Sequence, residues 1–285
     1  MKFAEMPYQR VDTDAVVAAL KELTQKMKTA KSGEEQFRIH QKFYALRDEY
    51  NTMIQIATIR SDVDTTDTYY SGEKDYYNEV FPTINNQETE YRKVLYDSPY
   101  RAELEEKIGK VAFKSMELEF KAMNEKLIPL MREENALTTR YDNLIAGAKI
   151  DWEGETLNLS LLRPYMTHED RAIRRRAYEK YSAFFQSKAG ELDEIYDKLV
   201  KNRTTQARLL GYENYVELGY YRLNRNSYGK KEVENFRRQI KTYFVPLAEK
   251  IHDRRRERLG LEKLSYVDEG VYFAGGNPKP YGTGV

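Results

Sequence analysis

The sequence of 285 residues contains no cysteine, only one tryptophan and only three histidines. The lack of cysteine excludes disulfides, thiolate metal ligands and cysteine nucleophiles together. No apolar run is long enough to span a bilayer, and the N-terminus lacks the apolar region of a secretion signal. We therefore expect a cytoplasmic protein that has no membrane partner.

Signatures of common active sites are missing as well. Neither glycine-rich phosphate loop occurs, and no Gly-x-Ser-x-Gly elbow is present. A zinc peptidase needs His-Glu-x-x-His, because this spacing places both imidazoles on one helix face. The chain has His168-Glu169, but Ala172 stands where the second histidine belongs. We interpret His168 as a locally satisfied or exposed residue in the first turn of a helix.

The two other histidines give no stronger signal. Glu249 and His252 form one Glu-x-x-His pair, whereas a di-iron bundle needs two such pairs and further glutamates. This pair indicates a charged face in solvent, and His40, on a helix rich in aromatic residues, indicates a position at the edge of the core. We assign no catalytic, cofactor-binding or metal-binding residue in this chain.

Charge of one sign is not in excess. The chain has 47 Lys and Arg against 46 Asp and Glu, a net charge of +1, which argues against a binder of polyanions. Arginines still gather in two places, at 171–176 and at 254–258. Acidic residues lie among them, and Asp170–Arg174 and Arg175–Glu179 have i,i+4 spacing, so we expect salt-bridged helix faces and no nucleic-acid partner.

Apolar residues at helical spacing dominate the rest of the sequence. Hydrophobic residues make up 40% and aromatic ones 13%, with 24 tyrosines, which indicates a folded protein. The spacing predicts long helices. They cover residues 11–27, 32–62, 72–97, 98–110, 113–145, 167–221 and about 230–260.

Prolines and capping residues predict where these helices bend or end. Pro82 should bend or break the third helix, and Pro129 and Pro246 should kink the fifth and the last. Ser98 is the predicted cap of one helix, with Pro99 at its first helical position, and Thr167 and Asp170 form a predicted capping box at the start of another. Gly260 is the predicted end of the last helix.

Two further patterns concern packing. Alternation on both sides of Glu153-Gly154 predicts a short β-hairpin, with Trp152 beside the turn as a packing residue. The last helix carries an apolar stripe. Its members are Val233, Phe236, Ile240, Phe244, Leu247 and Ile251. We predict a mainly α fold with a hairpin near 148–158, divided into an N-terminal helical lobe, 1–145, and a second part, 146–285, with the hairpin and long helices.

Three stretches together resemble the oligoendopeptidase F family, zinc-dependent peptidases related to thimet oligopeptidase. They are "KIDWEGETLNLSLLRPYMTHEDRAIRRRAYEKY", "ARLLGYENYVELGYYRLNRNSYGKKEVENFRRQI" and "VPLAEKIHDRRRERLGLEKLSYVDEGVYFAGGNPKP". Their order and spacing, from about Lys149 to Pro280, carry the resemblance, while the helices before Lys149 agree in character. The resemblance covers the N-terminal half of such an enzyme.

The resemblance implies a multi-helix peptidase fold around a channel for short peptides. It also implies a catalytic zinc held by His-Glu-x-x-His and a downstream glutamate, which activates water for attack on the peptide bond. In the family this motif follows the Asn-Pro-x-Pro stretch, at 277–280 here, so we expect this chain to be incomplete at its C-terminus and to stop before the chemistry.

The expected function follows from that position. Zinc belongs to the complete parent enzyme, and we expect none bound by this chain, which is inactive alone. Its expected partners are short peptides and either the missing catalytic half or a second copy of the chain. The alternatives are a stand-alone helical peptide-binding or scaffold protein, and half of a split enzyme that is completed in trans.

Overall fold

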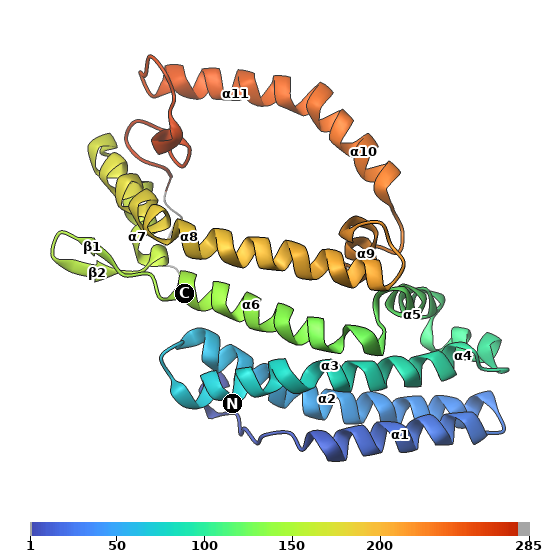
Figure 1. The fold of residues 1–285 in the computed structure, drawn as a ribbon. Helices are drawn as coiled ribbons and strands as arrows, with labels where there is room; N and C mark the ends of the chain where they lie inside the picture. The colour runs from blue at the N-terminus through green and yellow to red at the C-terminus, as the bar shows by residue number, and fades with distance from the viewer. Residues whose placement is uncertain (1, 279–285) are drawn as a thin grey trace. The chain divides into compact units, whose positions relative to one another are not determined.

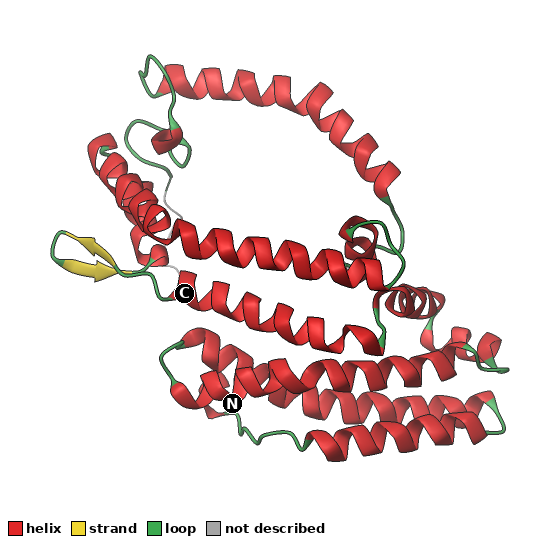
Figure 2. Cartoon of the chain, viewed as in Figure 1, coloured by secondary structure: helices red, strands yellow, loops and turns green. Residues whose placement is uncertain are grey.

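The computed structural model describes residues 2–278, and these are mainly helical with one two-stranded antiparallel hairpin (Figures 1 and 2). The predicted fold class is confirmed. Contacts divide the chain into two compact units: the first comprises residues up to 140 and residues 195–229, and the second comprises 141–194 and 230 onward. The predicted domains, 1–145 and 146–285, are sequence segments and stay a prediction. Within residues 2–278, no helix has the length and apolar character that crossing a membrane requires.

The first unit contains a series of antiparallel and crossing helices. They are α1 (Thr13–Thr29), α2 (Gly33–Val63), α3 (Thr68–Tyr96), α4 (Arg101–Ile108), α5 (Lys110–Ala122), most of α6 (Ile128–Ala146), the end of α8 (Arg171–Leu209) and α9 (Tyr215–Arg222). Short 3-10 turns at Phe3–Glu5 and Glu125–Leu127 complete it.

Two helices of this unit begin directly after a capping side chain. The Asp12 carboxylate accepts a hydrogen bond of 3.0 Å from the Ala15 N–H, and Ser32 Oγ accepts one of 3.1 Å from the Glu35 N–H. Each side chain satisfies a backbone donor that has no partner inside the helix. The predicted cap of α4 is wrong: Ser98 Oγ accepts from the Tyr100 N–H and donates to Gln36, so it closes a turn, and the helix begins at Arg101.

Aromatic stacking forms the centre of the first core. The rings of Phe43 and Tyr91 lie 4.2 Å apart and almost parallel, and His40 stacks beside both. His40 is 3% exposed, so it lies inside the core, and the predicted place at the edge is wrong. Burial lowers the pKa of His40 to about 4, which keeps the ring neutral at pH 7.

Neither Pro82 nor Pro129 breaks the helix at its own position. Helix α3 continues through the buried Pro82 without a break. Near Pro129 the predicted kink is instead a full break one turn earlier, at Met123 and Asn124, which have extended backbones. Pro129 then occupies the first turn of α6, where its missing N–H would have no partner in any case.

The second unit contains the hairpin and a further set of helical segments. Its elements are β1 (Ile150–Trp152), β2 (Glu155–Leu157), α7 (Leu159–Met166), the first part of α8, α10 (Lys230–Gln239), α11 (Val245–Arg258) and a 3-10 turn at Tyr266–Asp268. Helix α7 is missing from the predictions. Its cap is Asn158, whose side chain accepts a hydrogen bond from the Leu161 N–H.

The hairpin forms where the sequence predicts it. Ile150 pairs with Leu157, and Glu153 and Gly154 both have positive φ, at 53° and 92°, as a type I′ turn requires. Trp152 is buried and packs on Tyr165 with ring centroids 4.6 Å apart, so its predicted packing role is confirmed.

The substitution Glu153→Asn should raise the free energy of unfolding by about 0.5 kcal/mol, because Asn adopts positive φ at a lower cost than Glu. The exposed ion pair of Glu153 with Arg176 is lost in this variant. Glu153→Gln loses the same pair but keeps the strained backbone, and is the matched control. Urea unfolding of the three proteins checks this; equal stability of the Asn and Gln variants would contradict it.

The last helix begins at Lys230, as predicted, but it contains one π-helical turn, Ile240–Phe244, between α10 and α11. This turn lies just before Pro246. Because proline has no N–H to donate, the regular series of α-helical hydrogen bonds is interrupted there. Gly260, with φ 64°, follows the end of α11, and the Leu261 N–H donates to the Arg256 carbonyl over 3.1 Å. The predicted stop at Gly260 is confirmed.

The apolar stripe of this helix is exposed. Phe236 and Phe244 are each 62% exposed, and Leu247 is 52% exposed. An amphipathic helix normally buries such a stripe against a core. The stripe therefore lacks a cover among the described residues.

Candidate functional site

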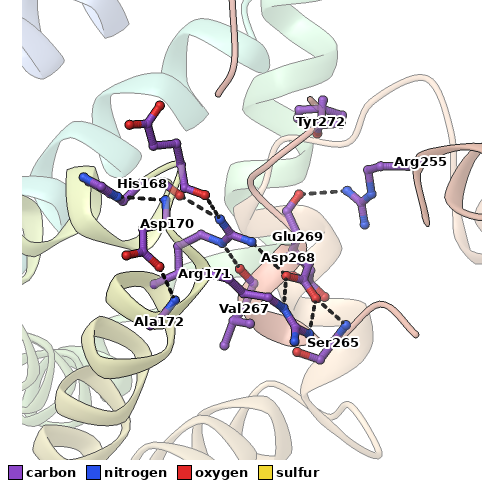
Figure 3. Close-up of polar contacts among 12 residues, drawn as sticks. His168, Asp170, Arg171, Ala172, Arg255, Ser265, Val267, Asp268, Glu269 and Tyr272 are labelled. Carbon is purple, nitrogen blue, oxygen red and sulfur yellow. Dashed lines mark hydrogen bonds and ion pairs between the residues drawn. The ribbon is translucent and has the colours of Figure 1, made fainter. Parts of the chain in front are cut away.

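A network of polar contacts in the second unit is built around Asp268 (Figure 3). This carboxylate is fully buried and accepts from Arg174 over 3.0 Å and from Arg171 over 2.8 Å. The Ser265 N–H also donates to it over 2.9 Å. These contacts tie the turn at Tyr266–Asp268 to the start of α8, and we call them the Asp268 clasp.

Arg174 holds the clasp together through several acceptors. Besides Asp268, its guanidinium donates to the backbone carbonyls of Val267, His168 and Glu169, at 2.8–2.9 Å. The hydrogen bond from Arg171, with those from Ser265 and Arg174, holds the pKa of Asp268 well below its usual range despite burial. The carboxylate is therefore ionised at any ordinary pH.

The start of α8 differs from its prediction. Thr167 ends α7, and Asp170 caps α8 by accepting a 2.7 Å hydrogen bond from the Ala172 N–H. The predicted capping box of Thr167 and Asp170 is therefore wrong. His168 lies in the loop before the helix, where Nδ1 accepts from the Asp170 N–H over 3.0 Å. Local satisfaction of His168 is confirmed, but its place in the first helical turn is wrong.

The arginines of the first cluster find distant partners. Arg174 pairs with Asp268, 94 positions away, rather than with Asp170, and Arg176 pairs with Glu153 across 23 positions. In the second cluster, Arg256 lies 3.9 Å from Asp253 and 3.5 Å from Glu257, as local pairing predicts. Ion pairing is thus confirmed for both clusters, but the predicted Asp170–Arg174 pair is wrong because a buried carboxylate competes for the same guanidinium.

A pocket of about 500 Å³ lies beside the clasp within the second unit. Its lining is His252, Arg255, Leu264, Ser265, Tyr266, Glu269 and Tyr272. Arg255 is 5% exposed, donates to the Glu269 carbonyl over 2.9 Å and lies 5.4 Å from the centre of the Tyr272 ring. Within residues 2–278, Arg255 Nε and Ser265 Oγ have no hydrogen-bond partner. The sequence predictions do not include this pocket. The one signal in the sequence for the clasp beside it is the Ser-x-x-Asp spacing of Ser265 and Asp268.

Buried carboxylates of the first unit are also paired with cations. Glu73 accepts from Arg10 and Tyr8, and hydrogen bonding from Arg10 lowers its pKa. Glu88 accepts from Arg92 and Tyr50. Carboxylates that pair with cations in this way are typical of structural networks rather than of a general acid.

Glu134 forms a third network in the first unit. It accepts from Arg203 at 2.7 Å, from Gln206 at 2.7 Å and from Arg222 at 3.0 Å. Burial raises the pKa of Glu134, but the donors Arg203 and Gln206 and the charge of Arg222 outweigh it and hold the pKa below its usual value. This carboxylate also lacks the raised pKa of a proton donor.

The histidines do not gather into a metal site. His252 is exposed on α11 beside the pocket, as is Glu249 on the same helix, in line with the predicted solvent face. Across the described part of the chain, no group of three or more His, Asp or Glu side chains is placed to hold a metal ion.

Two family models match most of the chain. The Peptidase M3 N-terminal domain matches residues 3–123, and Peptidase family M3 matches residues 164–273. The chain belongs to peptidase family M3. The resemblance to oligoendopeptidase F found in the sequence is thereby confirmed.

Solved structures agree with the M3 family. A PZ peptidase A with an inhibitor is 41% identical to this chain, with a TM-score of 0.96 over 99% of the chain. A protein described as an oligoendopeptidase F from Bacillus anthracis is 38% identical, with a TM-score of 0.96 over all of the chain. This M3 chain spans 50–52% of the length of these solved chains. No curated protein sequence matches it.

Proposed function

We propose that this chain serves as the N-terminal portion of a zinc-dependent oligoendopeptidase that hydrolyses short peptides inside a helical channel. The observation that carries the proposal is the likeness to PZ peptidase A over 99% of the chain, at 41% identity. In this function the helices described above contribute to the wall of the channel. A wall of this kind admits flexible oligopeptides and excludes folded proteins.

The zinc of the proposed enzyme does not fit the residues described here. Zinc needs three or four His, Cys, Asp or Glu ligands that converge on one point. Residues 2–278 contain no such group, and the clasp carboxylate of Asp268 is already held by two arginines. We therefore propose that this chain alone binds no catalytic zinc and has no peptidase activity.

The exposed stripe on α10 and α11 supports a partner for this chain. Phe236, Phe244 and Leu247 expose apolar side chains to solvent along one helix, and groups of this kind mark interaction surfaces. The solved relatives are about twice as long as this chain, so each has a second half of comparable size. We propose that the occupant of the stripe is the catalytic half of an M3 peptidase.

Mixing experiments test this function. The purified chain is expected to leave a quenched oligopeptide uncut, with or without added zinc. Hydrolysis should appear only when a polypeptide carrying the second half of an M3 peptidase is added, and a chelator should abolish it. Hydrolysis by the chain alone would contradict the proposal, and peptide binding without cleavage in the mixture would favour a stand-alone binding protein.

A variant of the stripe sharpens the mixing test. Phe244→Asp places a charge in the apolar face and should lower the affinity for the second half by about tenfold or more. Lys241→Asp introduces the same carboxylate at an exposed polar position of the same π turn and is the matched control. Equal affinities of the two variants would contradict docking at the stripe. If Phe244→Asp instead abolished a dimer of the chain alone, the occupant would be a second copy.

A further inference from the structure

The pocket beside the Asp268 clasp contains a buried cation without an anion. Arg255 is 5% exposed, and its hydrogen-bond acceptor is a backbone carbonyl, that of Glu269. No ion pair joins Arg255 to an acidic side chain within residues 2–278. Burying a guanidinium without a neutralising partner is costly, so this environment favours the binding of an anion.

The neighbouring clasp cannot supply that anion. Asp268 is shared between Arg171 and Arg174, at 2.8 Å and 3.0 Å, and its remaining donor is the Ser265 N–H. Two guanidinium groups thus share one carboxylate directly beside the pocket that Arg255 lines. These guanidinium groups add to the attraction for a negative ligand, against the opposing charge of Glu269 in the pocket lining.

Other groups around the pocket suit a small organic carboxylate. Ser265 Oγ has no partner in the described part of the chain, and the side chains of Tyr266 and Tyr272 line the same space. The volume of about 500 Å³ has room for one or two amino-acid residues. Arginine pairs with a planar carboxylate through two parallel hydrogen bonds, and the tyrosine rings offer apolar surface to the rest of the ligand.

We propose that this pocket is a carboxylate-binding site in which Arg255 receives the C-terminal carboxylate of a short peptide. That the ligand is a peptide rests on the proposed function, whereas the preference for a carboxylate rests on the buried cation. Tyr266 and Tyr272 flank the ligand, and Ser265 Oγ donates to its carboxylate. The side chain of Glu269, also in the lining, opposes the ligand by its charge.

Calorimetry on the full chain tests this site with two probes. N-acetyl-glycyl-tyrosine carries a free carboxylate, and its C-terminal amide differs only in lacking the charge. The free acid should bind at least about tenfold more tightly than the amide, the range of one charge-assisted contact. Equal binding of acid and amide, or binding of neither, would overturn the proposal.

Three variants locate the contact. Arg255→Gln should remove the preference for the acid, and Arg254→Gln, an exposed arginine at the adjacent position, should keep it within about twofold. Glu269→Gln keeps the carbonyl that Arg255 uses and should bind the acid more tightly than the native chain. Because the acid and amide are compared in the native chain, the test decides even if Arg255→Gln fails to fold.

The test also separates a peptide from another source of the carboxylate. If the free acid does not bind, but Arg255→Gln weakens association with the second half of an M3 peptidase, an acidic side chain of that half fills the pocket and the ligand proposal fails. Failure of acid binding leaves the proposed peptidase function standing, because that function is tested by hydrolysis in the mixture. Failure of hydrolysis likewise leaves the binding result intact.

Discussion

The substitution Asp268→Asn is expected to lower the free energy of unfolding of the second unit by about 3 kcal/mol. Asp268 and Arg174 are 0% and 4% exposed, so the substitution leaves a buried guanidinium without its anion. Removing one partner of a buried ion pair typically costs about 3–5 kcal/mol. We expect the low end of this range, because the amide of Asn keeps part of the hydrogen bonding. Arg171, which is 37% exposed, is the partner that solvent screens more strongly.

The same clasp sets a pH dependence. Since the pKa of Asp268 is lower in the folded chain than in the unfolded one, its contribution is fully present above the unfolded pKa of about 4. The contribution is lost as the pH falls below that value toward the folded pKa. The stability of Asp268→Asn should therefore depend less on pH in this acid range than that of the native chain.

Hydrogen exchange measured by mass spectrometry, at neutral pH and in the acid range, checks both expectations. Peptides from the start of α8 and from residues 262–275 should exchange faster in Asp268→Asn at neutral pH. Asp253→Asn, the same change at a carboxylate that is 70% exposed on α11, is the control and should leave exchange unaltered. Equal protection in the two variants would mean that the clasp contributes nothing to the fold.

The second large effect is expected in the core of the first unit. Phe43→Ala should cost about 3–5 kcal/mol, because it removes a ring that is 1% exposed and stacked on Tyr91. Phe236→Ala makes the same chemical change at a ring that is 62% exposed, and should change stability by less than about 0.5 kcal/mol.

Urea unfolding of the two phenylalanine variants, followed by circular dichroism at several protein concentrations, makes the comparison. A cost above about 1 kcal/mol for Phe236→Ala would mean that the stripe is covered in solution. If that cost also rose with protein concentration, the cover would be a second copy of the chain. A small cost for Phe43→Ala would contradict the packing described for the aromatic stack.

Features with local causes could be predicted from the sequence. Asp12 and Ser32 cap their helices through bonds to residues three positions away, and the turn at Glu153-Gly154 depends on two backbone conformations. The effects of the prolines were harder to predict, because each effect depends on where along the chain the strain is relieved. Helix α3 accommodates Pro82, whereas the chain relieves the strain of Pro129 by breaking one turn earlier.

Features with distant causes could not be predicted in the same way. The i,i+4 rule pairs Arg174 with Asp170. The carboxylate of Asp268, 94 positions away, is buried from water and therefore attracts the guanidinium more strongly. Likewise, periodicity predicts the apolar stripe of the last helix but contains no information about what covers it. The pocket at Arg255 depends on a loop returning to α11, for which the sequence has no periodic signal.

The position of Trp152 has a spectroscopic consequence. It is the only tryptophan in a chain with 24 tyrosines. It lies buried in the hairpin of the second unit, and its Nε1 has no hydrogen-bond partner within the described residues. Selective excitation of the indole therefore reports on one unit alone, while circular dichroism follows the helices of both. A difference between the two unfolding curves would reveal that the units melt separately.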